Sequence, residues 1–262
     1  MKVAIVTGGS SGIGLSTAKS LSTSGCTVYE FSRRDIKTAG INHITCDVTD
    51  ETLVASSVKQ VMDTEGHIDI LVCSAGFGIS GAVEFTRSED AKRQMDVNFF
   101  GTVNAVKACL PVMRKQHSGR IICISSVAGA IAIPFQTYYS ASKAAINSYA
   151  RALRNEVKPF GIEVAAVMPG DICTGFTDAR NKDIEGDAIY GGRISRSVAG
   201  MEKDERNGMP ADTAGRFICE LALKRIIKPV YAIGMQYRLF TLLSRILPER
   251  LVCYIIGKMY AM

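Results

Sequence analysis

The sequence lacks the features that mark several classes of protein. Its eight cysteines form no CxxC pair, and the closest two, Cys109 and Cys123, are 14 positions apart, which excludes zinc ribbons, dithiol redox motifs and haem attachment. We therefore expect reduced, buried thiols and no metal site. No uncharged apolar run approaches the roughly 18 residues of a membrane span. The opening segment MKVAIVTGG reaches glycine too early for a signal peptide, so we expect a cytoplasmic protein.

The chain is also short of net charge over most of its length. The formal charge of +6 on 262 residues arises entirely in residues 224–262, where seven basic side chains meet one acid, Glu249. Residues 1–223 are therefore neutral overall, and no nucleic-acid reading motif accompanies the basic segment, so we expect no nucleic acid as a partner. With 47% hydrophobic residues, the chain is long and apolar enough to bury a large core, and disorder is excluded.

Short valine- and isoleucine-rich runs alternate with helix-like stretches. The expected strands are Val3–Val6, Thr27–Phe31, Ile41–Thr45, Ile68–Cys73, Arg120–Ile124, Glu163–Val167 and Val230–Ile233, and the expected helices are Gly14–Ser24, Glu51–Glu65, Ser88–Gln116 and Tyr138–Phe160. This alternation predicts an α/β fold with a doubly wound parallel sheet of about seven strands. We find no linker and no internal repeat, and therefore predict a single domain over residues 1–262.

Two stretches depart from a regular repeat. The interval Ser32–Gly40 is too short for a full crossover helix, so we expect a loop or a single turn there. Residues 171–210 are glycine-rich and charged, with isolated apolar side chains. An insertion of this kind is either a functional lid or a disordered loop, and we favour a substrate lid.

A glycine-rich turn joins the first strand to the first helix. In TGGSSGIG, Thr7 to Gly14, the glycines have no Cβ to keep a diphosphate from the backbone, and the helix offers free N–H groups. We expect a dinucleotide diphosphate here, although a tight strand-to-helix turn alone would also explain the glycines. Arg33 and Arg34 end the second strand, where a guanidinium suits the 2′-phosphate of NADP. The alternative is a solvated surface pair, and Glu30 and Asp35 lie nearby.

Several polar residues are candidates for chemistry. Tyr139 and Lys143 are four positions apart and share a helix face, so the ammonium can shift the phenol toward a working acid/base; an amphipathic surface pair is the alternative. Ser126 follows the fifth expected strand, at the edge where open α/β sheets bind ligands. Asn98, taken alone, is better explained as a satisfied core amide than as a catalytic group. Asp47 would accept from adenine or cap the helix that begins near Thr49.

Taken in order, these motifs resemble the short-chain dehydrogenase/reductase family over about the first 175 residues. They are TGxxxGIG at 7–14, DV at 47–48, AG at 75–76, Asn98, ISS at 124–126, YxxxK at 139–143 and PGxxxT at 169–174. The resemblance implies a Rossmann-like fold and hydride transfer between NAD(P) and a carbonyl or secondary alcohol. It implies that Tyr139 is the general acid/base, that Lys143 binds the nicotinamide ribose and lowers the tyrosine pKa, that Ser126 polarises the carbonyl, and that Asn98 holds a relay water.

The resemblance also extends the set of cofactor-binding residues and exposes one departure. The expected set is Gly8, Ser10, Ser11, Gly12, Ile13, Gly14, Arg33, Arg34, Asp47, Val48, Ala75, Gly76, Tyr139, Lys143, Pro169, Gly170, Ile172 and Thr174. The basic position after the second strand implies NADP in preference to NAD. Where the family carries NNAG, this chain has Cys73-Ser74-Ala75-Gly76, which puts local hydrogen bonding in doubt but removes no catalytic group.

The expected substrate pocket is apolar with few fixed charges, which suits a lipophilic ketone or alcohol such as a steroid, retinoid-like, acyl or small aromatic carbonyl. Its expected walls are Phe77, Ile79, Ile131, Ile133, Phe135 and Phe176, beside Ser126. A rival hypothesis from another class is a non-catalytic NADPH-binding redox sensor. The four intact catalytic candidates argue against it.

The C-terminal segment, residues 236–262, reads as a basic amphipathic helix that Pro248 ends before another helix begins. It would cover the substrate mouth, form a subunit interface or lie on an anionic membrane, and a membrane-surface scaffold is the hypothesis that depends on this segment alone. We favour the first two roles. The long helices at 88–116 and 138–160 would pair symmetrically in a homodimer or homotetramer, as they do in the family.

Overall fold

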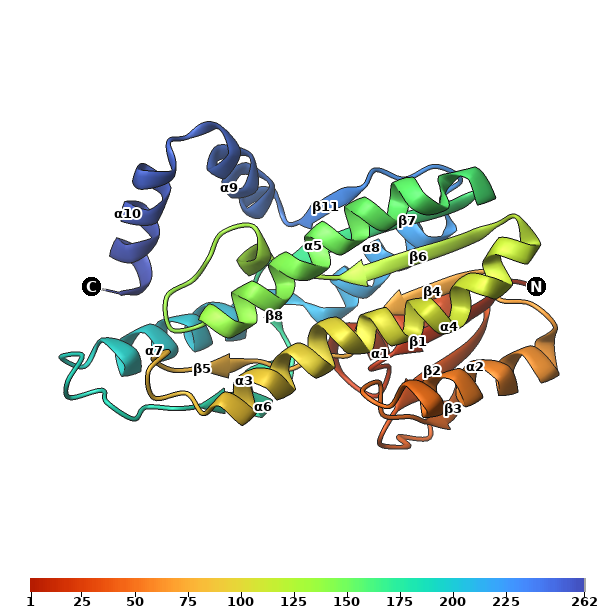
Figure 1. The fold of residues 1–262 in the computed structure, drawn as a ribbon, viewed down its shortest axis with the longest axis horizontal. Helices are drawn as coiled ribbons and strands as arrows, with labels where there is room; N and C mark the ends of the chain where they lie inside the picture. Colours follow the sequence, from red (N-terminus) through yellow and green to blue (C-terminus); the bar gives the residue numbers. More distant parts are fainter. Residues whose placement is uncertain (262) are drawn as a thin grey trace.

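The computed structural model of the chain describes residues 1–261. Its centre is a seven-stranded sheet in the order β11-β7-β6-β4-β1-β2-β3, in which every neighbouring pair is parallel (Figure 1). The strands are β1 (Val3–Thr7), β2 (Thr27–Ser32), β3 (Asn42–Thr45), β4 (Ile70–Cys73), β6 (Gly119–Ile124), β7 (Ile162–Pro169) and β11 (Val230–Ile233). The predicted doubly wound parallel sheet is confirmed, and each strand overlaps its expected range.

Helices cover both faces of this sheet, which explains why the strands are apolar throughout. One face carries α2 (Glu51–Glu65), α4 (Gly101–Gln116) and α5 (Thr137–Val157), and the other carries α1 (Gly12–Thr23) and α8 (Ala211–Leu223). Helix α8, which the sequence reading did not predict, packs directly on α1, where the Ser16 hydroxyl donates to Asp212 at 2.8 Å. Six of the eight free cysteines are buried, whereas Cys173 and Cys253 are exposed.

The long helix expected over residues 88–116 is interrupted. It comprises α3 (Ser88–Met95), a π-helical turn (Asp96–Phe100) and α4. Such turns are frequent at functional sites because they re-aim a side chain inward, and this one contains the fully buried Asn98. The loop expected between the second and third strands is present, since the stretch between β2 and β3 contains no helix.

Residues 171–210 are folded, so the disordered alternative is contradicted. They form β8 (Ile172–Cys173), α6 (Phe176–Ala179), β9 (Asn181–Lys182), α7 (Arg193–Arg206) and β10 (Met209–Pro210). Short parallel pairings of β8 with β10, and of β5 (Ile79–Ser80) with β9, fasten the segment to itself and to the chain after β4.

The chain ends in two helices, α9 (Met235–Ile246) and α10 (Glu249–Tyr260). Pro248 lies between them and begins α10, as expected. Figure 1 shows both helices, in dark blue, together with α7 beyond the carboxyl ends of the central strands. Among residues 1–261, we find no helix with the length and apolar character needed to cross a bilayer.

Candidate active site

A cavity of about 1200 Å³ opens at the carboxyl ends of the strands. It begins between β1 and β4, where the strand order reverses, which is the position at which open α/β sheets bind ligands. From there it passes the end of β6 and continues beneath α9 and α10. One space therefore joins the expected dinucleotide site to the two C-terminal helices.

All residues predicted to bind the cofactor line this cavity. They are Gly8, Ser10, Ser11, Gly12, Ile13, Gly14, Arg33, Arg34, Asp47, Val48, Ala75, Gly76, Tyr139, Lys143, Pro169, Gly170, Ile172 and Thr174. The set comes from six separate segments of the chain, and the parallel topology brings them together at one edge of the sheet.

The turn after β1 is shaped to receive a diphosphate. Gly8 and Gly12 have φ angles of +67° and +52°, which side chains disfavour, and a Cβ on Gly8 would lie 2.7 Å from the backbone of Ala75. Within the described chain, no side chain caps the first turn of α1, so its N–H groups remain open to an anion. The residues present therefore fit a dinucleotide.

The end of β2 favours a 2′-phosphate. Arg33 and Arg34 are exposed and line the cavity. Neither of the two nearby acids lines the cavity. The Glu30 carboxylate is buried against His43, and Asp35 accepts from the Lys37 backbone N–H at 2.8 Å. No carboxylate therefore stands in for the acid that binds the ribose of NAD in other Rossmann folds.

Asp47 lies at the adenine side of the cavity and does not cap a helix. Its Oδ1 accepts from the backbone N–H and the hydroxyl of Thr49, at 3.0 and 2.8 Å, whereas Asp50 caps α2 by accepting from Leu53 at 2.9 Å. Burial raises the pKa of Asp47, but these hydrogen bonds and the nearby Arg33 outweigh it and lower the pKa overall. The carboxylate is thus kept as an acceptor.

The departure from NNAG leaves the backbone satisfied. The hydroxyl oxygen of Thr7, at the end of β1, accepts from the N–H groups of Ser74 and Ala75 at 3.1 and 3.3 Å. This side chain holds the start of the loop after β4, so the missing asparagines leave those two N–H groups paired.

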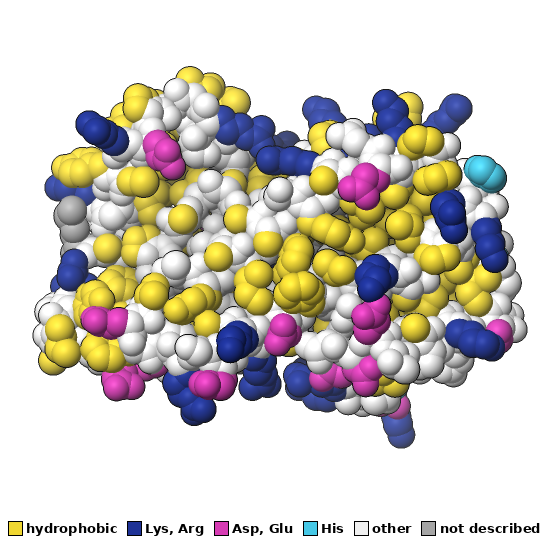
Figure 2. Space-filling model, in the orientation of Figure 1, with side chains coloured by type: hydrophobic (Ala, Val, Ile, Leu, Met, Phe, Trp, Pro, Cys, Tyr) yellow, Lys and Arg dark blue, Asp and Glu magenta, His cyan; other side chains and the backbone are white. Residues whose placement is uncertain are grey.

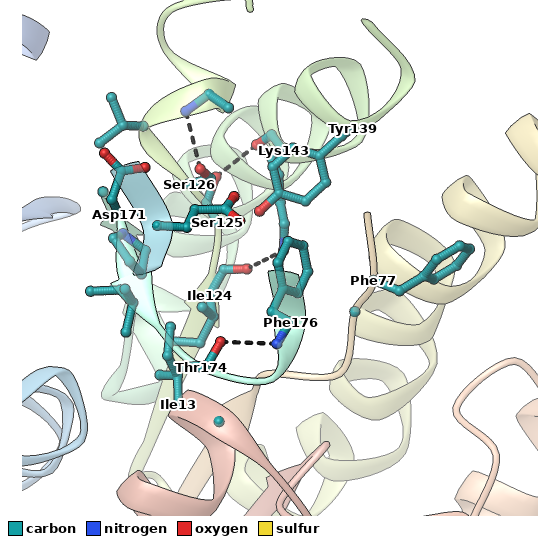
Figure 3. A pocket seen from close by; sticks show the side chains of 18 of the residues that line it. Ile13, Phe77, Ile124, Ser125, Ser126, Tyr139, Lys143, Asp171, Thr174 and Phe176 are labelled. Atoms are coloured by element: carbon teal, nitrogen blue, oxygen red, sulfur yellow. Dashed lines mark hydrogen bonds between the residues drawn. The ribbon is translucent and has the colours of Figure 1, made fainter. Parts of the chain in front are cut away.

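Tyr139 projects from the first turn of α5 toward Ser126 and Phe176 (Figure 3). Its ring centroid lies 5.7 Å from that of Phe176. We expected the neighbouring lysine to lower the pKa of the phenol, but burial deep in the molecule raises it to about 12, and interaction with the Ser126 hydroxyl only partly opposes this effect. At neutral pH the residue is therefore a protonated phenol, the form needed by a general acid.

Lys143 lies one helical turn further along α5 and is almost fully buried. Its ammonium donates to the backbone carbonyl of Ile124 at 3.0 Å and lies 5.7 Å from the centre of the Tyr139 ring. Burial lowers the pKa of Lys143 to about 8. The surface-pair alternative for Tyr139 and Lys143 is therefore contradicted.

Two further catalytic candidates differ in how they face the cavity. Ser126 lines it and accepts from the Ala128 N–H at 3.1 Å. Asn98 lies behind Gly76, where its Oδ1 accepts from the Phe77 N–H at 3.0 Å, while its amide donates to Phe77 O and to Ser142 at 3.1 and 3.0 Å. Asn98 thus has the contacts of a satisfied buried amide, and it fixes the loop after β4.

The expected substrate walls are only partly assembled. Ile131, Ile133, Phe77 and Phe176 line the cavity, whereas Ile79 and Phe135 do not. Ile79 is buried in β5, and the ring of Phe135 packs edge-on against Tyr190 at 5.8 Å. The Phe77 ring points away from Tyr139 (Figure 3) and lies under the Arg93 guanidinium.

Two groups of cavity residues were not among the predicted walls, although the expected position of the C-terminal helices over the substrate mouth is confirmed. One is an apolar wall from α9 and α10, namely Tyr237, Phe240, Leu243, Leu247, Val252, Ile255, Ile256, Met259 and Tyr260. The other consists of the carboxylates Asp171, Asp204 and Glu205, so the pocket carries more fixed charge than we expected. Glu205 is paired with the buried Arg180. Amphipathic spacing in the tail was the one signal present for the first group.

Comparisons with known proteins agree with this geometry. The model of the short chain dehydrogenase family matches residues 2–185. The chain belongs to this family. It is 43% identical over 227 residues to a 3-ketodihydrosphingosine reductase of Bacteroides thetaiotaomicron, covering 86% of this chain and 84% of the relative. It is 33% identical to a probable short-chain type dehydrogenase/reductase of Helicobacter pylori, over 94% of this chain and 93% of the relative.

Solved structures show the same fold. A short-chain dehydrogenase from Streptomyces avermitilis superposes with a TM-score of 0.82 at 28% identity, over 94% of this chain and 92% of that one. ElxO, solved with NADP bound, has a TM-score of 0.75 at 25% identity, over 90% and 98% of the two chains. The chain is therefore an oxidoreductase that acts on C=O and CH–OH groups.

Proposed function

We propose that this short-chain dehydrogenase is an NADP(H)-dependent reductase of a long-chain, lipophilic ketone. The observation that carries the proposal is the continuity of one cavity. It places the Tyr139 phenol and the Ser126 hydroxyl between the glycine-rich turn and an apolar wall made by α9 and α10. Residues 171–210 form the remaining wall, and we propose that they act as a lid over the substrate.

The cofactor preference rests on Arg33 and Arg34. Their guanidinium groups face the cavity, while Glu30 and Asp35 are engaged elsewhere, and a 2′-phosphate suits guanidinium donors. ElxO, with its bound NADP, supports the same preference in a related fold. Cells normally keep most of their NADP in the reduced form, NADPH, so we propose reduction as the physiological direction. We also propose the cytoplasm as the location.

The chemistry assigned to this chain is proton transfer and charge stabilisation. A bound reduced nicotinamide supplies the hydride. The protonated phenol of Tyr139 donates its proton to the carbonyl oxygen, and the Ser126 hydroxyl donates a hydrogen bond to the same oxygen as negative charge develops there. Lys143, which lines the cavity, would bind the nicotinamide ribose, whereas Asn98, with its side chain paired to Phe77 and Ser142, would act by holding the loop after β4 in place.

The length of the cavity favours an extended substrate. Beyond Tyr139 the lining is largely aliphatic and aromatic as far as Met259 in α10, which suits a hydrocarbon chain attached to the ketone. The 43% identical relative is named for its action on 3-ketodihydrosphingosine, a long-chain ketone, and this supports the same substrate class here.

A panel of ketones tests the proposal. The purified chain is mixed with NADPH or NADH and with ketones of increasing chain length, including 3-ketodihydrosphingosine, and coenzyme oxidation is followed. We expect kcat/KM to rise with chain length and to be higher with NADPH. Turnover confined to anionic sugars or acids would overturn the lipophilic-substrate proposal. Coenzyme binding without turnover of any carbonyl would instead favour the redox-sensor hypothesis.

We also propose that α4 and α5 form a subunit interface in a homodimer or homotetramer. Figure 2 shows hydrophobic side chains gathered over these two helices. Phe100 is 50% exposed, and it contacts Phe99, which in turn packs on Tyr149. Sedimentation equilibrium checks the assembly, and Phe100→Arg should shift it toward the monomer.

A further inference from the structure

The helix α9 is apolar on two sides, which is unusual for a helix at a protein surface. One side, with Tyr237, Phe240 and Leu243, lines the cavity. The other side carries an outer stripe formed by Met235, Leu239, Leu242 and Ile246, which are 87%, 52%, 53% and 69% exposed. These four positions follow the spacing of a single helix face. None of them lines the cavity or belongs to a buried cluster.

Exposed basic side chains accompany this outer stripe. Arg238 and Arg245 lie along α9 itself, and Arg250 and Lys258 are exposed on α10, where Lys258 lies over the ring of Tyr254. We call these four residues the basic rim. Residues 235–261 contain one acid, Glu249, against these four cations. Figure 2 shows hydrophobic and basic side chains mixed over α9 and α10, at the upper left.

We propose that the outer stripe and the basic rim dock the enzyme on the surface of an anionic lipid bilayer. Apolar side chains of an interfacial helix enter the boundary between headgroups and acyl chains, while arginine and lysine bind anionic headgroups. The docking is peripheral, because α9 has 12 residues and α10 has 12, too few to cross the hydrocarbon core.

This inference rests on the proposed function and extends it. The cavity wall and the outer stripe are two sides of the same helix. When α9 is docked, only the thickness of this helix lies between the acyl region of the bilayer and the active-site cavity. Phe240, Leu243, Ile255 and Met259 line the cavity and are still 42%, 37%, 41% and 55% exposed, so the mouth between α9 and α10 is open. A lipophilic ketone can then pass from the bilayer to Tyr139 without crossing water.

Charge distinguishes a bilayer from a second copy of the chain as the occupant. A twofold contact places the same patch against itself. Here that would bring two basic rims together, each with four cations and one acid, and like charges would repel across the interface. An anionic surface neutralises the same charges, so the basic rim favours lipid over self-association.

Vesicle sedimentation tests the proposal with the full chain. The probes are vesicles of phosphatidylcholine alone and vesicles that also contain phosphatidylglycerol, each at low and high salt. Two double variants are compared with the wild type: Leu242→Gln with Ile246→Gln in the outer stripe, and Arg245→Glu with Arg250→Glu in the basic rim. A matched control, Lys19→Glu with Ile226→Gln, changes an exposed cation and an apolar side chain that is 76% exposed outside the tail.

We expect the wild type and the control to bind the anionic vesicles, with binding weakened by salt. Each tail variant should lower the partition coefficient by about tenfold or more, because one removes two apolar side chains from the interface and the other reverses two charges near an anionic surface. All variants should keep the wild-type melting temperature and the wild-type turnover of a short, water-soluble ketone without vesicles. That turnover shows that the tail variants are folded.

Two results would overturn the docking proposal. One is equal binding of the wild type and both tail variants to anionic vesicles. The other is a dimer in sedimentation equilibrium that the outer-stripe variant dissociates, since the stripe would then cover a second copy. Failure of the reductase proposal would give a different result, because the chain would still bind anionic vesicles but would reduce no ketone.

Discussion

The phenol of Tyr237, in the first turn of α9, donates a hydrogen bond to the carboxylate of Asp171, in the loop that follows β7. This bond links the C-terminal helices to the loop beside the expected nicotinamide site. The contact is close, because a Cβ on Gly170 would lie 2.1 Å from the Tyr237 ring. Burial raises the pKa of Asp171 and raises that of Tyr237 to about 12, so the phenol stays protonated as the donor.

We predict that Tyr237→Phe loosens the tail over the cavity. The change removes the donor to a partly buried carboxylate, which costs about 1 kcal/mol. The KM for a long-chain ketone should rise severalfold, while kcat for a short ketone changes little, because Tyr139 and Ser126 are untouched. The control is Tyr231→Phe, which also loses one hydrogen bond, from the Lys228 N–H, but lies outside the cavity lining. An unchanged KM would show that this bond does not position the tail.

Tyr139→Phe should keep the coenzyme site and lose the chemistry. The phenol is the proposed proton donor, and removing such a group lowers rates by roughly 10²–10⁴-fold. Turnover with NADPH should fall by that amount, while the dissociation constant for NADPH, measured by fluorescence titration, stays near the wild-type value. Tyr138→Phe is the matched control at the adjacent position. Retained turnover in Tyr139→Phe would remove this residue from the mechanism.

The fold could be read from the sequence because each strand is buried on both faces and therefore uniformly apolar, as in VAIVT of β1 and ILVC of β4. The glycine-rich turn and the YxxxK pair could also be predicted from the sequence, because each is defined by a short local pattern of residues. Helix α7 was not predicted from the sequence, because charge and glycine around residues 186–208 mask the apolar positions Ile194, Val198 and Met201 that face inward. Helix α8 was not predicted either, although Ala214, Ile218 and Leu221 have the spacing of one helix face.

The cavity wall was harder to foresee than the catalytic residues. Ile79 and Phe135 follow the right strands, but the pairing of β5 with β9 and the packing of Tyr190 turn them away from the cavity. The residues that replace them come from α9 and α10, more than 90 positions after Tyr139. The amphipathic spacing of residues 236–262 indicated a helix that could cover the substrate mouth. Which of its residues line the cavity depends on how the tail folds back, and local spacing does not specify this.

We predict that Arg33 and Arg34 determine the choice of coenzyme. Replacing both with alanine removes charge-assisted hydrogen bonds to a 2′-phosphate, each worth about 1.5–3 kcal/mol. The KM for NADPH should rise by about 10-fold or more, whereas the KM for NADH should change little, because NADH has no phosphate there. Lys19→Ala serves as the control for loss of a surface cation. Equal effects on both coenzymes would assign the pair to general electrostatics.

Lys143 should leave a signature in the pH dependence of stability. Its pKa is lowered to about 8 in the folded chain by burial and lies near 10.4 when unfolded. The unfolded state therefore binds more protons between these values, so the contribution of Lys143 to stability rises with pH in that window and is lost as pH falls through about 8. Between about pH 8 and 9.5, the unfolding free energy of the wild type should increase relative to that of Lys143→Met by about 1.5 kcal/mol. Urea unfolding of both proteins at the same pH values measures the difference. The tyrosines, which titrate at higher pH, are the same in both proteins, so their contributions cancel. A constant difference across the window would show that the ammonium is not desolvated in the folded chain.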